Sequence, residues 1–275
     1  MDILSRPHLS PDHCIAYGSN PSQIGHLWLP EREDRPLSPL VVFFHGGWWK
    51  SKHGLGYAGY LCSAMKKEGI ACWSVEYRRV GGTGGGWPFT FHDVAAGLDF
   101  VVSLARTYPL DLARVITMGH SAGGHLAFWC AGRHHLAPQT ELYLGEQKVA
   151  LVGSIALAGA VDLASTIALA GNGQFAHDQQ EVEDLMGGSP LTQPERYQQG
   201  DPAAMLPFHV PQILIQGTED DQIPPDLPML WAERAGGLGD AIIVKIIPGA
   251  GHLDVVDPES AAWPTVLDCV KGFLI

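Results

Sequence analysis

The chain has 275 residues, of which 46% are hydrophobic and 17% are charged, and this is enough to bury the core of one large α/β domain over residues 1–275. The formal net charge of −12 repels phosphate groups, so neither nucleic acid nor an anionic membrane surface is expected as a partner. The longest apolar stretch, residues 149–161, is too short to span a bilayer.

The five cysteines are odd in number, widely spaced and without a C-x-x-C pair, so they predict neither a disulfide framework nor a zinc site. Most of them lie in apolar contexts, where a free cysteine behaves as a small hydrophobic residue. The first residues lack the basic and apolar regions of a signal peptide. The sequence therefore predicts a cytoplasmic protein. No His, Asp or Glu cluster has metal-ligand spacing, and neither a metal nor another cofactor is expected.

Short apolar runs alternate with amphipathic stretches along most of the chain. A short strand is expected at 26–30, and stronger candidates follow at 40–44, 70–77, 114–119, 150–157, 212–217 and 241–247. Helices are expected near 55–68, 90–106, 122–134, 225–236 and 259–273. The stronger strands are continuously hydrophobic, which is typical of parallel strands covered on both faces. The pattern predicts an α/β fold with a doubly wound, mostly parallel sheet.

The strand at 40–44 runs directly into His45-Gly46-Gly47-Trp48-Trp49. Adjacent glycines let the bare backbone approach a ligand where a Cβ would intrude. Two interpretations are open for this loop alone. It is either a simple glycine turn with its aromatic residues in the core, or a site where backbone N–H groups must reach a reacting atom. In the second case His45 is expected to hold the loop in shape.

A candidate nucleophile follows the strand at 114–119. Gly119-His120-Ser121-Ala122-Gly123 fits the pattern G-x-S-x-G, with a strand before it and a helix-like segment after it. This context lifts the serine above the edge of a sheet and aims the N-terminus of the next helix at the reacting centre. A glycine-rich turn without chemistry is the alternative for the motif alone. A serine hydroxyl also needs a histidine to accept its proton and a carboxylate to orient that histidine.

The regular alternation of strands and helices stops between residues 162 and 210. No strong strand is predicted there, and several prolines and one acidic amphipathic segment at 179–188 occupy the stretch. A long excursion inside a compact α/β domain is usually functional. We therefore expect residues 162–210 to form a small cap-like insertion over one end of the sheet.

The acid and the base are expected after Ser121, in the order Asp or Glu and then His, each on a loop after a later strand. The second-last predicted strand is followed by Glu219-Asp220-Asp221. The last is followed by His252. Both loops begin at the carboxyl ends of strands, where parallel sheets place their sites. We predict His252 as the base and Asp220 as the acid, with Asp221 as the reserve or as a helix cap.

These assignments predict a role for the glycines of the loop at 45–49. Acyl transfer creates a negative oxygen that needs fixed hydrogen-bond donors. The backbone N–H groups of Gly46, Gly47 and Ala122 are predicted to supply them as an oxyanion hole. Trp48 and Trp49 are expected to form walls of the substrate pocket and to restrict it to short acyl groups.

On these motifs the sequence resembles the α/β-hydrolase superfamily over nearly its whole length. The His-Gly-Gly loop and Glu76-Tyr77-Arg78 are similar to the hormone-sensitive-lipase-like esterases. The form H-G-G-x-W at 45–49 looks like the arylformamidase, or kynurenine formamidase, branch. The resemblance implies a cofactor-free hydrolase that acts on N-formyl-kynurenine or small esters. The loop at 81–87 (GGTGGGW) is assigned to neither group.

Three functions are open at this point. The favoured one is a serine hydrolase, either a carboxylesterase or an arylformamidase, with a small short-acyl substrate as its partner. A peptidase of the prolyl-oligopeptidase type shares the order of the three residues, but its large propeller domain is not found in these 275 residues. A catalytically silent binding protein of the same fold normally lacks one of the three residues, and all three are present here.

Overall fold

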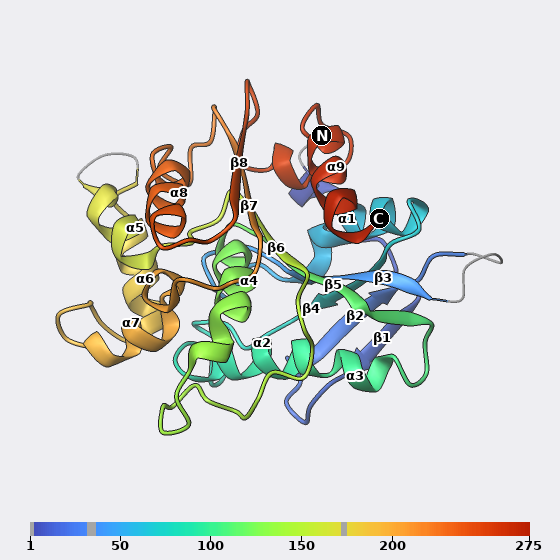
Figure 1. Ribbon diagram of the computed structural model, residues 1–275, viewed down its shortest axis with the longest axis horizontal. Helices are drawn as coiled ribbons and strands as arrows, with labels where there is room; N and C mark the ends of the chain where they lie inside the picture. The colour runs from blue at the N-terminus through green and yellow to red at the C-terminus, as the bar shows by residue number, and fades with distance from the viewer. Residues whose placement is uncertain (1–2, 32–36, 172–174) are drawn as a thin grey trace.

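The computed structural model describes residues 3–31, 37–171 and 175–275, and these form one eight-stranded sheet with helices on both faces (Figure 1). The strands are β1 (His13–Ala16), β2 (Ile24–Trp28), β3 (Ser38–Phe44), β4 (Ala71–Val75), β5 (Leu110–His120), β6 (Gly153–Leu157), β7 (Gln212–Gly217) and β8 (Ile242–Ile247). Their order across the sheet is β1-β2-β4-β3-β5-β6-β7-β8. The β1–β2 and β2–β4 pairs are antiparallel, and the remaining pairs are parallel. The predicted α/β fold with a mostly parallel sheet is confirmed.

Helices cover the sheet on both sides and bury its central strands. Every residue of β3, β4, β6 and β7 is buried, as continuous apolar runs predict. One core cluster joins the sheet to α1 (Ala58–Lys67) and α9 (Trp263–Leu274). The opposite cluster joins it to α2 (Phe89–Asp99), α3 (Val101–Leu104), α4 (Ala122–Gly132) and α8 (Leu227–Gly237). Short 3-10 helices occur at η1 (Ile3–Ser5), η2 (Leu55–Tyr57), η3 (Arg133–His135) and η5 (Asp254–Val256).

The two edges of the sheet differ from the sequence prediction. Strand β1 is not predicted, because a mostly exposed edge strand of four residues carries no continuous apolar signal. Strand β8 is predicted in the right place, but it is not covered on both faces, since Ile243 is 50% and Ile246 is 44% exposed. The physical reason is its position at the end of the sheet, where one flank has no neighbouring strand among the described residues.

The described residues between 162 and 210 contain no strand, as predicted. They fold into α5 (Leu163–Ala170), α6 (Asp178–Met186), α7 (Pro194–Gly200) and the 3-10 helix η4 (Pro202–Met205), which Figure 1 shows grouped on one side of α4. Lys50 Nζ lies 2.7 Å from Glu181 Oε2 and 2.7 Å from Asp184 Oδ2. The Trp87 N–H donates to Leu185 O at 2.9 Å. These contacts join α6 to the loops that follow β3 and β4.

Candidate active site

Ser121 lies at the sharp turn between β5 and α4. Its backbone has φ 56° and ψ −121°, a conformation that residues other than glycine rarely adopt. The residue is 3% exposed. The turn can be this tight because Gly123 lies against β3, where a Cβ would come within 2.0 Å of Phe44 O. The glycine of the motif is therefore required by packing, and the serine is held in a strained position at the end of a central strand.

His252, in the loop after β8, contacts Asp220, in the loop after β7. Nδ1 of His252 lies 2.9 Å from Asp220 Oδ2 and 3.1 Å from Oδ1. The carboxylate also accepts from the N–H groups of Gln222 at 2.8 Å and Ile223 at 3.0 Å. Burial acts to raise the pKa of Asp220, but His252 and these N–H groups outweigh burial and lower the pKa below its ordinary value. Asp220 therefore stays ionised near neutral pH and orients the His252 ring.

The neighbouring carboxylates of the acidic cluster take other positions. Glu219 and Asp221 are exposed, whereas Asp220 is 8% exposed. Asp221 accepts a hydrogen bond from Gln222 Nε2 at 3.1 Å. The structure therefore brings Asp220, rather than Asp221, to His252.

Ser121 and His252 line one cavity of about 360 Å³. The cavity lies at the carboxyl edge of the parallel strands, where β3, β5, β7 and β8 end, and this is the edge at which such sheets place their sites. The other residues that line it are Leu4, Gly47, Trp48, His53, Tyr57, His120, Asp221, Gln222 and Leu253. The structure thus brings the predicted nucleophile, base and early loop together.

The loop after β3 passes directly beside the serine. A Cβ on Gly46 would lie 2.8 Å from His120 O and 2.9 Å from Ser121 Cβ, so only glycine fits. The Gly46 N–H, however, donates to Tyr57 Oη at 2.6 Å. Gly46 therefore serves the site through its small size, and the prediction that it supplies an oxyanion donor does not hold for this arrangement.

The other two predicted donors lie close to Ser121. Gly47 lines the cavity. Ala122 is the first residue of α4, and N–H groups in a first helical turn have no acceptor within the helix. The positive end of the α4 dipole lies at the same point. Gly47 and Ala122 therefore remain as candidates for the oxyanion hole.

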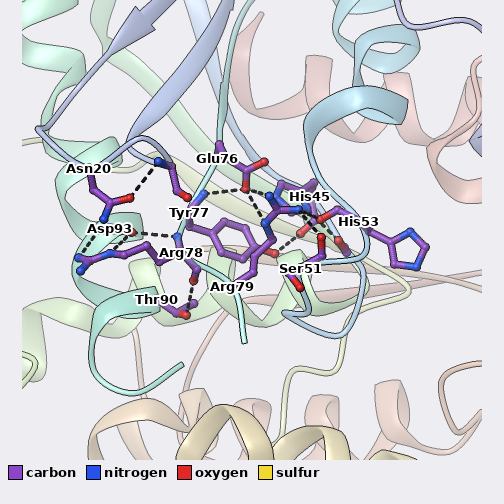
Figure 2. Close-up of polar contacts among 12 residues, drawn as sticks. Asn20, His45, Ser51, His53, Glu76, Tyr77, Arg78, Arg79, Thr90 and Asp93 are labelled. Atoms are coloured by element: carbon purple, nitrogen blue, oxygen red, sulfur yellow. Dashed lines mark hydrogen bonds and ion pairs between the residues drawn. The ribbon is translucent and has the colours of Figure 1, made fainter. Parts of the chain in front are cut away.

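Buried polar contacts hold the shape of this loop (Figure 2). His45 Nδ1 lies 2.8 Å from Gly46 O, its Nε2 lies 2.9 Å from Glu76 Oε1, and its ring stacks on Tyr77 with 4.4 Å between centroids. The Glu76 carboxylate also accepts from the Tyr77 N–H and pairs with Arg79. Burial raises the pKa of Glu76, but His45 and Arg79 outweigh it and lower the pKa overall. His45 thus holds the loop as expected, and the Glu-Tyr-Arg stretch after β4 anchors it.

The two tryptophans of the loop have different surroundings. Trp48 lines the cavity, and its ring lies edge-on to His177, with 5.6 Å between centroids. Trp49 is 0% exposed and packs in the core, edge-on to His125. Both residues have positive φ, 51° and 56°, so the chain turns sharply and neighbouring side chains diverge. The prediction that Trp49 forms a pocket wall is wrong for this reason, and Trp48 occupies the wall.

The loop at 81–87 supports the segment 162–210 and contributes none of the residues that line the cavity. Trp87 N–H bonds to α6 as described above, and the Arg196 guanidinium of α7 lies 5.6 Å from the Trp87 ring centroid. Trp87 Nε1 donates to Glu141 Oε2 at 2.9 Å. Trp87 therefore packs between the loops of the sheet and helices α6 and α7.

Several lining residues escape sequence reasoning. Leu4 reaches the cavity because its neighbour Arg6 bonds to both carboxylate oxygens of Asp257, at 2.9 and 2.5 Å. Arg6 and Asp257 are 251 residues apart, and no local sequence pattern predicts such a contact. Tyr57 and His53 lie in a segment without a motif. The only usable signal is topological, since they follow the glycine loop before α1 begins.

Within residues 3–31, 37–171 and 175–275, no helix is long and apolar enough to cross a membrane. Over the same residues, no group of three or more His, Cys, Asp or Glu side chains is arranged to hold a metal ion.

Known proteins resemble the chain in sequence over different lengths. Neutral cholesterol ester hydrolase 1 of Rattus norvegicus is 35% identical over 102 residues, which are 36% of this chain and 24% of that protein. Probable isoprenylcysteine alpha-carbonyl methylesterase ICMEL1 of Arabidopsis thaliana is 27% identical over 250 residues, which are 88% of this chain and 50% of that protein. The chain thus spans half or less of the length of these curated relatives.

The fold is shared with solved esterases, and the family is shown by sequence. Esterase B from Lactobacillus rhamnosis has a TM-score of 0.81 at 19% identity, with 97% of this chain and 87% of that chain covered. At this identity the likeness shows the fold, which is the α/β-hydrolase fold. A model of the BD-FAE family matches residues 26–233, from β2 into α8 and including Ser121 and Asp220. The chain therefore belongs to the BD-FAE family.

Proposed function

We propose that the protein is a serine esterase with Ser121 as nucleophile, His252 as general base and Asp220 as the acid that orients it. The observation that carries the proposal is the 2.9 Å contact between His252 Nδ1 and Asp220 Oδ2, beside a cavity that His252 shares with Ser121. With Nδ1 bound to the carboxylate, Nε2 is the nitrogen left to accept the serine proton. The names of the two curated relatives, an ester hydrolase and a methylesterase, support an ester substrate.

The reaction proceeds through an acyl-enzyme. Ser121 Oγ forms a bond to the ester carbonyl carbon while its proton passes to His252, and the carbonyl oxygen becomes negative. The N–H groups of Gly47 and Ala122 stabilise this oxygen. The C–O bond to the alcohol then breaks, and His252 returns the proton to the leaving oxygen. Water attacks the acyl-enzyme by the same steps and releases the acid.

The cavity favours a short acyl group. Its volume of about 360 Å³ lies near the lower end of small-molecule sites, and Trp48 fills one wall. An aromatic leaving group gains about 0.5–1.5 kcal/mol beyond burial from an aromatic neighbour. We therefore propose formyl to butyryl esters of aromatic alcohols as the substrate class. Aryl formamides are the second candidate, because the H-G-G-x-W loop that supplies Trp48 resembles the arylformamidases.

The decisive experiment combines covalent labelling with turnover. An organophosphate is expected to add one label to the wild-type protein and none to Ser121→Ala, while Ser103→Ala, on an exposed position of α3, labels normally. Turnover of p-nitrophenyl acetate, butyrate and decanoate and of N-formyl-kynurenine then separates esterase from formamidase activity. A wild-type protein that neither labels nor hydrolyses any of these compounds would show that the fold serves binding instead.

A further inference from the structure

We propose that Tyr57 and His120 are positioning residues. They hold the loop after β3 (residues 45–49), called here the oxyanion loop, and the loop that carries His252 in fixed positions relative to Ser121. The inference rests on the proposed function and adds two residues to it. Neither residue contacts reacting atoms through its assigned bonds. Both act through backbone groups on each side of the serine, and they link three loops that follow β3, β5 and β8.

The link is a continuous series of hydrogen bonds. The Gly46 N–H donates to Tyr57 Oη at 2.6 Å, Tyr57 Oη lies 3.0 Å from His120 Nδ1, and His120 Nε2 lies 2.9 Å from His252 O. Tyr57 is 7% and His120 is 2% exposed, so water offers little competition for these bonds. His120 immediately precedes Ser121, and the series therefore crosses the site at the nucleophile.

The acceptors fix the direction of every bond. The carbonyl oxygen of His252 can only accept, so His120 Nε2 carries the hydrogen. The neutral ring then presents Nδ1 as an acceptor, and the Tyr57 hydroxyl donates to it. A lone pair of Tyr57 Oη remains for the Gly46 N–H. The donor and acceptor roles of every group in the series are thus fixed, which favours one arrangement of the three loops.

The protonation states agree with this direction. Burial, followed by the nearby His252, lowers the pKa of His120 to about 3, so its ring stays neutral near neutral pH. Burial also raises the pKa of Tyr57, so its hydroxyl keeps its proton. The His120 and His252 ring centroids are 4.6 Å apart. A charged His120 would repel the imidazolium that forms on His252 during catalysis, whereas the neutral ring does not.

Tyr57→Phe tests the link at the oxyanion side. The variant keeps the ring and its packing but removes the hydroxyl, so it leaves the Gly46 N–H and His120 Nδ1 without this partner. We expect kcat to fall by about 10-fold or more, because fixed donors and placement are each worth at least that much, with KM within about twofold. Tyr60→Phe is the matched control, because its hydroxyl donates to Pro7 O outside the series.

His120 is tested by a pair of variants. His120→Gln retains an amide that can donate to His252 O and a carbonyl that can accept from Tyr57, whereas His120→Leu retains neither. We expect His120→Gln to keep a kcat several-fold higher than that of His120→Leu, at comparable folding by circular dichroism. A merely structural role would lower the unfolding midpoint and leave the kcat of the folded protein unchanged.

The outcomes separate this inference from the proposed function. An unchanged kcat in Tyr57→Phe, or equal values in the two His120 variants, overturns the positioning role while the wild-type enzyme remains active. A loss of kcat confined to Tyr57→Phe and His120→Leu, with Tyr60→Phe unaffected, supports it. A wild-type protein without hydrolase activity and without organophosphate labelling overturns the proposed function itself.

Discussion

At the level of single residues, the acidic cluster gives a clear test of which carboxylate acts. Asp220→Asn should reduce kcat by about 10⁴-fold, as expected when the acid of such a triad is neutralised. Asp221→Asn should cost far less, because the Asp221 carboxylate, although it lines the cavity, is exposed and bonds to Gln222 instead of His252. Steady-state kinetics on p-nitrophenyl butyrate at neutral pH measure both, and a reversed order would assign the acid to Asp221.

The divergence of Trp48 and Trp49 makes a second test possible within one dipeptide. Trp48→Ala removes a cavity wall, so it should extend the accepted acyl length and weaken discrimination between butyrate and decanoate by about 1–3 kcal/mol. Trp49→Ala empties part of the core and should lower the free energy of unfolding by about 3–5 kcal/mol. The measurements are kcat/KM for C2 to C12 esters and urea denaturation. Broadened specificity in Trp49→Ala alone would contradict the assignment.

At the level of elements, helix α4 buries a titratable ring in its first turn. His125 is 0% exposed and donates from Nε2 to Gly200 O at 2.8 Å. Burial lowers its pKa to about 4, below the value of about 6.5 in an unfolded chain. Below pH 6.5 the His125 ring takes up a proton in the unfolded chain but stays neutral in the folded protein. The free energy of unfolding therefore decreases as the pH falls from 6.5 toward 4.

A pH series on His125→Gln measures this loss. Glutamine can keep a donor toward Gly200 O but does not titrate. The free energy of unfolding of the wild type, relative to the variant, should therefore fall by about 2 kcal/mol between pH 7 and pH 5. Urea denaturation at the two pH values gives the comparison. Parallel stability curves for the two proteins would mean that the ring is protonated equally in both states.

Local sequence predicts which loops follow strong strands, but it does not predict where every side chain in those loops points. Ser121, Asp220 and His252 are recognisable because each follows a strong parallel strand, and parallel strands bring such loops to one edge. Trp49 is misassigned because sequence order does not tell where adjacent side chains point in a left-handed turn. Tyr57 carries no motif at all, since its role depends on an N–H from the glycine loop and a ring from the nucleophile turn.

At the level of the whole molecule, we propose that the segment 162–210 acts as a cap held by Lys50. The ammonium lies between Glu181 and Asp184 of α6, and both carboxylates raise its pKa. Lys50→Met should loosen α6 and increase the rate of limited proteolysis within 162–210 by about threefold or more. Lys66→Met, which removes a surface pair with Asp12, is the control. Equal cleavage rates in the two variants would place the restraint elsewhere.

The strained turn at Ser121 lowers the stability of the fold at the position proposed for the nucleophile. A positive-φ backbone of this kind costs on the order of 1–3 kcal/mol for a residue with a side chain and far less for glycine. Ser121→Gly should therefore raise the free energy of unfolding by about 1 kcal/mol, measured by urea denaturation, while it abolishes turnover. A directed-evolution campaign that selects this protein for heat resistance alone would thus enrich inactive chains. Screens for robust variants must assay hydrolysis in the same round.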